Sequence, residues 1–342
     1  MTKITTSCTT ADINRRLGVH IGHYDDSRRP TGCTVCLYPE GATAGVSVVG
    51  AAPGTRETDL LHPSSTVNEI HGILLSGGSA YGLDAAGGMM RWLKAHEHGL
   101  NVGPVRVPIV PGAVLFDLWV DDFSTHPHGS GIYPDAEAGF RACINAMDPS
   151  LVCQSGNIGA GCGATVGKLN GNACAMRGGL GMAMIEVDGF AVAAIVACNA
   201  VGDVVDPDTG HIIAGARLNP TSREFLNAVS AELHGGLVSD LHLGTNTTIG
   251  VIMTDARLSK AEAQSLARIG HDGLARTIRP VHTSMDGDTL FTMATGKNQE
   301  SVDMMRLMTA TAEVTAHAVL AAVTNAHGLR IGDLWWPAAA DL

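Results

Sequence analysis

Aromatic residues are scarce in this 342-residue chain, where phenylalanine, tryptophan and tyrosine together make up only 4%. Basic residues are also few: 22 lysines and arginines stand against 33 acidic residues, for a formal net charge of −11. A chain with this charge and no lysine- or arginine-rich run lacks the electrostatic footprint of a nucleic-acid-binding protein. We therefore expect no nucleic-acid partner.

Long apolar runs are missing as well. The most apolar stretch, from Phe190 to Cys198, is far shorter than the roughly 20 residues that a membrane-spanning helix needs. The first residues, Met1 to Thr6, do not contain the apolar core of a signal peptide. These two absences predict a cytoplasmic protein with no membrane partner.

Metal-site and disulfide patterns are also lacking. The chain has eight cysteines, but only Cys33 and Cys36 have CxxC spacing, and no second pair follows. Both lie in an alternating, extended segment, where residues three apart point to opposite faces of a sheet. The 15 histidines show no HExxH spacing, so we interpret His20 and His23 as structural. The sequence predicts reduced thiols and no bound metal.

Glycine and apolar residues are plentiful, with 42 glycines and 45% hydrophobic residues, which is enough for a sizeable core with many tight turns. Residues 11–50 have the character of strands, and Ser79 to His98 that of a helix. Asp188-Gly189 connects two apolar strands in a hairpin. The Ser259-x-x-Glu262 capping box predicts a helix to about residue 278, and residues 301–327 predict a long buried helix.

One stretch combines a turn residue with a hydroxyl nucleophile. Asn246 precedes a β-branched run from Thr247 to Thr254 that predicts a buried strand. The Thr247 hydroxyl can attack the Asn246 carbonyl to form an ester that water then opens. The product is an N-terminal threonine whose amine, with a pKa of about 8, can serve as base for its own hydroxyl. The same residues also fit a plain turn that enters a strand.

The polar residues 216–245 predict a helix and linker that would expose the bond between Asn246 and Thr247. The glycine-rich residues 156–168 are not a phosphate loop, because Cys162 and Leu169 occupy positions that require glycine and a hydroxyl residue. Lys168 is instead interpreted as a charge aimed into a pocket.

Three other polar sites are candidates for chemistry. Asn199 follows an apolar strand, where its amide can act as an oxyanion donor or simply as a turn residue. Tyr133 precedes a helix that has Pro134 in its first turn, and is expected to project toward a cleft or to be buried. Asp286 and Asp288 form a turn into a strand, but they fit no complete calcium loop.

Asn246-Thr247-Thr248, followed by His282-Thr283-Ser284-Met285-Asp286-Gly287-Asp288-Thr289-Leu290-Phe291, resembles the self-cleaving amidohydrolases of the L-aminopeptidase/D-amidase/D-esterase family. Within that family the nylon-oligomer (6-aminohexanoate-oligomer) hydrolase branch is most similar. The resemblance extends from about residue 11 to about residue 325 through further motifs in order: 18–23, 52–59, 76–83, 133–135, 161–168 and 199–202.

This resemblance implies an α/β fold, a four-layer α-β-β-α sandwich like that of N-terminal-nucleophile hydrolases. It also implies one domain, residues 1–342, that cuts itself into pieces 1–246 and 247–342. Such pieces remain one folded unit, and these units usually form homo-oligomers, tetramers or larger. The implied activity is hydrolysis of a small amide or peptide substrate without a metal or organic cofactor.

By position, the resemblance implies that Thr247 is the nucleophile and that Lys168 lowers the pKa of neighbouring groups. It likewise implies that Asn199 and Tyr133 stabilise the oxyanion. Asp286 and Asp288 match an acidic pair that would orient the Thr247 amine and favour its charged form. The aminopeptidase branch mostly has serine at the nucleophile position, often preceded by glycine, which argues against a narrow aminopeptidase specificity here.

Two alternatives remain. An acyltransferase like the ornithine acetyltransferases would share the layered fold and a threonine nucleophile, although their Ala-Thr-Met-Leu-type stretch is missing here. A catalytically inactive binding protein would also keep the fold. Retention of the whole set of candidate residues argues against this second alternative.

Overall fold

The computed structural model describes residues 3–5, 8–235 and 245–342. Its main sheet has ten strands: β1 (Lys3–Thr5), β2 (His20–Asp25), β3 (Gly32–Val48), β4 (Gly54–Arg56), β5 (Ile70–Ser76), β8 (Gly112–Val114), β11 (Gly179–Val187), β12 (Phe190–Asn199), β15 (Thr247–Ala256) and β17 (Thr289–Asn298). The helices are α1 (Thr10–Leu17), α2 (Ala85–Ala95), α3 (Ala136–Met147), α4 (Ala228–His234), α5 (Lys260–Thr277) and α6 (Met304–Thr324).

The remaining strands form small peripheral sheets: β6 (Leu100–Val102) with β7 (Val105–Val107), β9 (Thr165–Val166) with β10 (Met176–Arg177), β13 (Asp203–Val205) with β14 (Ile212–Ala214) and β16 (Ile278–Arg279), and β18 (Leu329–Ile331) with β19 (Leu334–Trp336).

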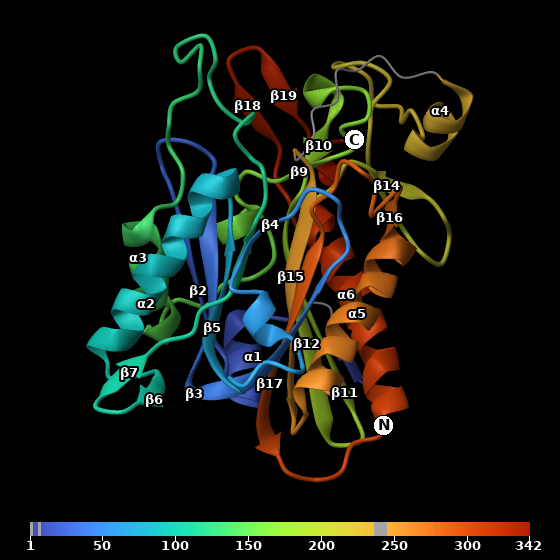
Figure 1. Ribbon diagram of the computed structural model, residues 1–342. Helices are drawn as coiled ribbons and strands as arrows, with labels where there is room; N and C mark the ends of the chain where they lie inside the picture. Colours follow the sequence, from blue (N-terminus) through green and yellow to red (C-terminus); the bar gives the residue numbers. More distant parts are fainter. Residues whose placement is uncertain (1–2, 6–7, 236–244) are drawn as a thin grey trace.

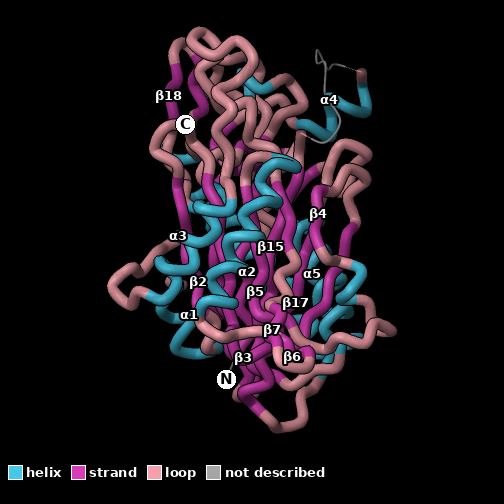
Figure 2. Tube along the Cα trace, turned by 60° about the vertical axis from the view of Figure 1, so that its left-hand side comes forward, coloured by secondary structure: helices cyan, strands magenta, loops and turns pink. Residues whose placement is uncertain are grey.

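The strand order of the main sheet is β1-β11-β12-β15-β17-β3-β5-β8-β4, and β2 pairs with β3. The long strand β3 belongs to both halves, because its first part pairs with β2 and β5 and its second part pairs with β17. Helices α2 and α3 cover the half that contains β2 and β5, and α5 and α6 cover the half that contains β11, β12 and β17 (Figure 1). Figure 2 brings α2 and α3 forward over β2 and β5.

Three apolar clusters separate four layers. One lies between α2–α3 and the first half of the sheet, one between the two halves, and one between the second half and α5–α6. Burial on both faces explains the apolar sequences of β11 and β12, and β15 is likewise buried along its whole length. The expected α-β-β-α sandwich is therefore confirmed.

Local signals predicted several elements well. The β11–β12 hairpin turns at Asp188 and Gly189, both with positive φ. Ser259 caps α5, and both hydrogen bonds of the capping box with Glu262 are present. Helix α6 covers most of the predicted residues 301–327. It is also the helix, among the described residues, that is long and apolar enough to cross a membrane, and here it packs on β11, β12 and α5.

Two sequence-based expectations were correct only in part, because strands β2 and β3 fill most of the segment predicted as β-rich, and helical residues do follow Gly78. The segment predicted as β-rich begins with α1, because a complete capping box between Thr9 and Asp12 starts a helix there. The helix predicted from Ser79 to His98 begins as a 3₁₀ turn over Ser79–Asp84 and ends at Ala95. Gly78 precedes it with a φ of 83°, a conformation that favours glycine.

Candidate active site

Three neighbouring strands bring the predicted site residues to one edge of the sheet. β12 runs antiparallel to β15, so its last residue, Asn199, lies opposite Thr247, the first residue of β15. β17 runs parallel to β15, so the turn before it, with Asp286 and Asp288, reaches the same edge. Asn246 forms an isolated bridge with Asp286. Side chains directly opposite in adjacent strands share one face, which places Asn199 beside Thr247.

Lys168 is fully buried, and Asn199 holds its ammonium group. The Lys168 Nζ donates to the Asn199 backbone oxygen at 2.9 Å, to Asn199 Oδ1 at 2.8 Å and to the Thr245 carbonyl at 3.3 Å. Asn199 Oδ1 also accepts from the Thr165 N–H at 3.0 Å, and its Nδ2 donates to the Phe116 carbonyl at 3.0 Å. The Lys168 charge, which the sequence analysis expected to point into a pocket, is held in the protein interior by these hydrogen bonds.

Burial lowers the pKa of Lys168 from 10.5 to about 7, against the opposing charge of Asp286. Both forms of the amine are therefore populated near neutral pH, the condition under which a side chain can best exchange protons. Burial, together with the charge of Asp288, also raises the pKa of Asp286 above its usual 3.8. Titratable groups shifted in this way cluster at functional sites.

The Thr247 hydroxyl turns back on the residue before it. Its Oγ1 contacts the carbonyl oxygen of Asn246, and the Gly287 N–H donates to the same oxygen at 3.0 Å. A Cβ at position 287 would lie 2.5 Å from the Ala52 carbonyl oxygen and 2.9 Å from Thr247 Oγ1. Only glycine therefore lets this backbone amide approach the Asn246 carbonyl so closely.

The bond between Asn246 and Thr247 is not exposed, which corrects the expectation from sequence. Asn246 is 0% and Thr247 3% exposed, because the bond lies inside the sheet edge between Asn199 and the 286–288 turn. Helix α4 precedes this region, and part of the predicted linker, residues 236–244, lies outside the described residues. Water and proteases have little access to such a bond, whereas the Thr247 hydroxyl already contacts its carbonyl oxygen.

The two aspartates organise the surrounding backbone. Asp288 accepts from the Thr248 N–H at 2.7 Å and faces His282 Nδ1 at 2.8 Å. Asp286 accepts from both the N–H and the hydroxyl of Thr283, each at 2.8 Å. Together the two carboxylates thus brace the start of β15 and the turn before β17.

Comparison with known proteins decides the family. The model of peptidase family S58 matches residues 12–333. The chain belongs to peptidase family S58.

Proteins of similar sequence agree with this placement. An uncharacterized aminopeptidase of Mycobacterium leprae is 44% identical over 82% of this chain and 77% of its own length. A 6-aminohexanoate-oligomer endohydrolase of Paenarthrobacter ureafaciens is 33% identical over 81% of this chain and 73% of its own. These similarities support an amide or peptide hydrolase activity for this chain.

Solved structures give the same fold. A Burkholderia sp. β-aminopeptidase covers 99% of this chain and 94% of its own, with a TM-score of 0.67 and 18% identity. An L-aminopeptidase D-Ala-esterase/amidase of Ochrobactrum anthropi, described as a variant of the Ntn hydrolase fold, aligns with a TM-score of 0.64 and 17% identity over 96% of this chain and 90% of its own.

Tyr133 is the one predicted site residue of this S58 chain that stands apart. Its ring stacks on Tyr81 with centroids 4.6 Å apart, and its Cβ lies against Gly78. No hydrogen bond among the described residues joins its hydroxyl to Thr247, Lys168 or Asn199. Tyr133 is half-buried, which is intermediate between the projecting and the buried side chain that the sequence left open.

Sequence analysis missed a histidine pair behind the aspartates. His282 faces Asp288, and its ring lies edge-on to His271 with centroids 4.8 Å apart. Burial lowers the pKa of His282, but the hydrogen bond and charge of Asp288 outweigh burial and raise it above 6.5. His282 also has a φ of 57°, uncommon for a residue other than glycine. The only sign of His282 in the sequence was its position at the start of the motif that runs from residue 282 to residue 291.

A buried ion pair on the other side of Asn199 was also missed. Asp117 accepts from Arg29 Nη2 at 2.8 Å, from the Thr31 hydroxyl at 2.6 Å and from the Gly78 N–H at 2.9 Å. The residue before it, Phe116, provides the carbonyl that orients the Asn199 amide. The pair therefore holds the loop on which the Asn199 side chain depends.

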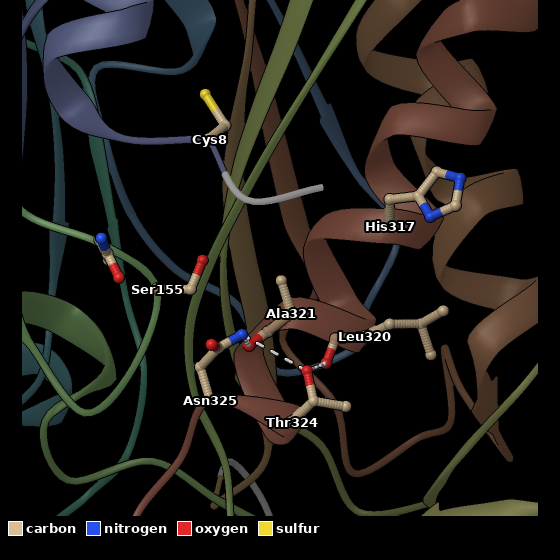
Figure 3. A pocket seen from close by; sticks show the side chains of 8 residues that line it. Cys8, Ser155, His317, Leu320, Ala321, Thr324 and Asn325 are labelled. Atoms are coloured by element: carbon tan, nitrogen blue, oxygen red, sulfur yellow. Dashed lines mark hydrogen bonds between the residues drawn. The ribbon is translucent and has the colours of Figure 1, made fainter. Parts of the chain in front are cut away.

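A separate cavity of about 350 Å³ is lined by the C-terminal part of α6, by Cys8 and by residues 154–155 (Figure 3). The Thr324 hydroxyl donates to the Leu320 carbonyl, and the Asn325 side-chain amide donates to the Ala321 carbonyl. These two polar groups of the lining therefore already have hydrogen-bond partners within α6. None of the predicted site residues lines this cavity. Among the described residues no group of three or more histidine, cysteine or acidic side chains is arranged to hold a metal.

The raised pKa of His282 has a testable consequence for stability. Because its folded-state pKa lies above 6.5, the stabilisation from protonated His282 and Asp288 is fully present below 6.5 and is lost as pH rises through the folded value. We expect His282→Gln to lower the free energy of unfolding by about 1 to 3 kcal/mol at acidic pH and by less at alkaline pH.

Urea unfolding of both proteins across this range measures the difference. The matched control is His62→Gln, which changes an exposed histidine whose ring bonds the neighbouring Ser64. A constant difference for His282→Gln at all pH values would contradict the assigned ion pair.

Proposed function

We propose that this S58 protein is a self-cleaving amide and peptide hydrolase whose nucleophile is the N-terminal Thr247 released by its own cleavage. The observation that carries this proposal is the contact between the Thr247 hydroxyl and the Asn246 carbonyl oxygen. The same carbonyl oxygen also accepts a hydrogen bond from the Gly287 N–H. Nucleophile and oxyanion donor thus converge on one peptide bond, as acyl transfer requires.

Self-cleavage would proceed as an acyl shift. The Thr247 oxygen attacks the Asn246 carbonyl carbon, and the carbonyl oxygen becomes an oxyanion that the Gly287 N–H stabilises. The C–N bond then breaks, the proton lost by the Thr247 hydroxyl is transferred to the nitrogen, and an ester joins Asn246 to the Thr247 oxygen. Water hydrolyses the ester and leaves a carboxylate on Asn246 and a free amine on Thr247.

Substrate hydrolysis would reuse the same groups. The Thr247 amine takes the hydroxyl proton, the oxygen attacks the substrate carbonyl, and the resulting acyl-enzyme is hydrolysed by water. Departure of the Asn246 end would free the Lys168 donor that now holds the Thr245 carbonyl. We assign Lys168 to the charge balance of the site, Asn199 and Tyr133 to the oxyanion, and Asp286 and Asp288 to the amine.

The names of the relatives define the substrates to try. By their names, one relative is an aminopeptidase and another is an endohydrolase of 6-aminohexanoate oligomers, so we propose an amide or peptide substrate of one of these two kinds. Amino-acyl amides and 6-aminohexanoate oligomers are the two substrate series that separate these activities.

Intact-mass spectrometry with N-terminal sequencing tests the proposal. We expect two pieces, residues 1–246 and 247–342, the second of which begins Thr-Thr-Ile-Gly-Val. An uncut chain that hydrolyses amides at full rate would contradict the N-terminal nucleophile. An uncut, inactive chain would contradict self-cleavage.

Tyr133→Phe separates the two reactions. Because the Tyr133 ring stacks on Tyr81 and its hydroxyl has no bond to the Asn246 carbonyl in the described structure, we expect processing to continue. Loss of one oxyanion donor should lower kcat for the substrate by about 10²- to 10³-fold. Mass spectra and steady-state kinetics measure the two effects, and Tyr81→Phe, which keeps the stacked ring pair, is the matched control. Unchanged kcat would remove Tyr133 from the oxyanion site.

A further inference from the structure

A pocket of about 360 Å³ lies beside the β9–β10 pair, with a buried arginine, Arg177, in its lining. Arg177 is only 2% exposed, and its Nη2 donates to the Cys162 carbonyl at 2.6 Å. Its Nε and Nη1 have no hydrogen-bond partner in the part of the chain that the structure describes. We propose that this pocket binds the carboxylate group of a small organic acid through Arg177.

The charge of the pocket supports an anionic ligand. Two other arginines line it, but each is neutralised: Arg28 by Asp26, with Nη2 and Oδ2 2.6 Å apart, and Arg29 by Asp117, with Nη2 and Oδ1 2.8 Å apart. Arg177 forms no ion pair with any described residue. The pocket therefore carries one positive charge in excess. A singly charged carboxylate balances this charge, whereas a doubly charged phosphate would leave a net negative charge.

An unpaired buried guanidinium is costly. Burying a charge without partners, or leaving N–H groups without acceptors, destabilises a protein unless a ligand supplies the missing interactions. Burial is strong enough to lower the pKa of Arg177 from 12.5 to about 10. Hydrogen bonds from a guanidinium to a carboxylate are among the strongest in proteins, so such a ligand would recover this cost.

The shape of the pocket fits a small molecule. Its volume is at the lower end of the range for ligand sites, about 300 to 1,000 Å³. Pro30 and Leu329 offer apolar surface for a short carbon skeleton, while the rim residues Ser27 and His327 are exposed to solvent. A buried cation beneath an open rim is the arrangement expected for capture of a small anion.

This site is separate from the proposed catalytic one and does not depend on it. None of the six predicted catalytic residues lines the pocket. Its walls come from both sides of the Asn246–Thr247 bond, since residues 26–30 and 177 precede the bond and residues 327–329 follow it. Arg177 pairs with Thr165 across β9–β10, and the Thr165 N–H donates to Asn199 Oδ1.

Isothermal titration of the full-length protein tests the proposal with acetate, acetamide and inorganic phosphate as probes. We expect saturable binding of acetate at one site per chain, and no binding of acetamide, which has the same shape without the charge. Acetate binding by Thr247→Ala should equal that of the wild type. Arg177→Met should weaken acetate binding by about tenfold or more.

Arg217→Met is the matched control, because Arg217 is equally buried but donates to several backbone carbonyls, including those of Ala173 and Pro220. Its acetate affinity should equal that of the wild type. The titrations of the unmodified protein decide the matter even if a variant does not fold. Absence of acetate binding, equal binding of acetamide, tighter binding of phosphate, or loss of acetate binding in Thr247→Ala would each overturn the proposal.

Discussion

Thr247→Ala is expected to remain a single chain and to lose about 10⁵- to 10⁶-fold in amide hydrolysis, as when the nucleophile of a hydrolase is removed. The hydroxyl that contacts the Asn246 carbonyl oxygen is absent in this variant, so the acyl shift cannot begin. The site would then also lack the free amine that serves as base. Intact mass and initial rates measure both losses.

Two control variants make this result specific. Thr247→Ser keeps a hydroxyl on the same backbone and should still be cleaved. Thr292→Val changes another buried threonine, whose hydroxyl has no hydrogen-bond partner among the described residues, into an isosteric apolar residue. It should process and react like the wild type, because an unsatisfied hydroxyl contributes nothing that valine lacks. Cleavage of the alanine variant at the same bond would exclude Thr247 as the nucleophile.

Lys168→Met should slow self-cleavage and lower kcat by about 10²- to 10³-fold, the usual effect of losing an oxyanion donor, because Asn199, which we assign to the oxyanion, depends on Lys168 for its position. The reason is structural as well as electrostatic. Lys168 holds both oxygens of Asn199, and methionine would leave Asn199 Oδ1 with the Thr165 N–H as its remaining described donor. Time-resolved mass spectrometry gives the rate of cleavage, and steady-state kinetics gives kcat.

The chain contains a matched control for this variant. Lys260 is also buried, and its ammonium group likewise makes three hydrogen bonds, here all to backbone carbonyls, those of Leu60, Ser65 and Val67 at 2.8 to 2.9 Å. Lys260→Met should lower stability while leaving the rate of cleavage intact. If both lysine variants slowed cleavage equally, the effect of Lys168 would be loss of folding and not of chemistry.

The elements predicted well from sequence share one property, which is that neighbouring residues determine them. The Asp188-Gly189 turn, the Ser259 capping box and the β-branched run of β15 each depend on a few consecutive residues. Helix α1 was missed although its capping box is just as local, because the strand-like residues after it dominated the interpretation.

The catalytic candidates depended on a second kind of information. No spacing in the sequence places Lys168 against Asn199 or Asp288 against the start of β15, since these pairs lie 31 and 40 residues apart. The resemblance to self-cleaving amidohydrolases supplied the candidates. The structure then brought five of the six together and left Tyr133 stacked on Tyr81.

The sequence by itself determined the strand that begins at Thr247, the turn residue before it and the apolar strands and helices of the layers, because periodicity and turn chemistry are written locally. Only the tertiary structure decided that the bond before Thr247 is buried, that the Gly287 N–H meets its carbonyl, and that His282 supports Asp288. Those features arise where segments far apart in the chain meet at one sheet edge. Contacts between distant segments produce no periodic pattern in the sequence, so the sequence alone does not predict them.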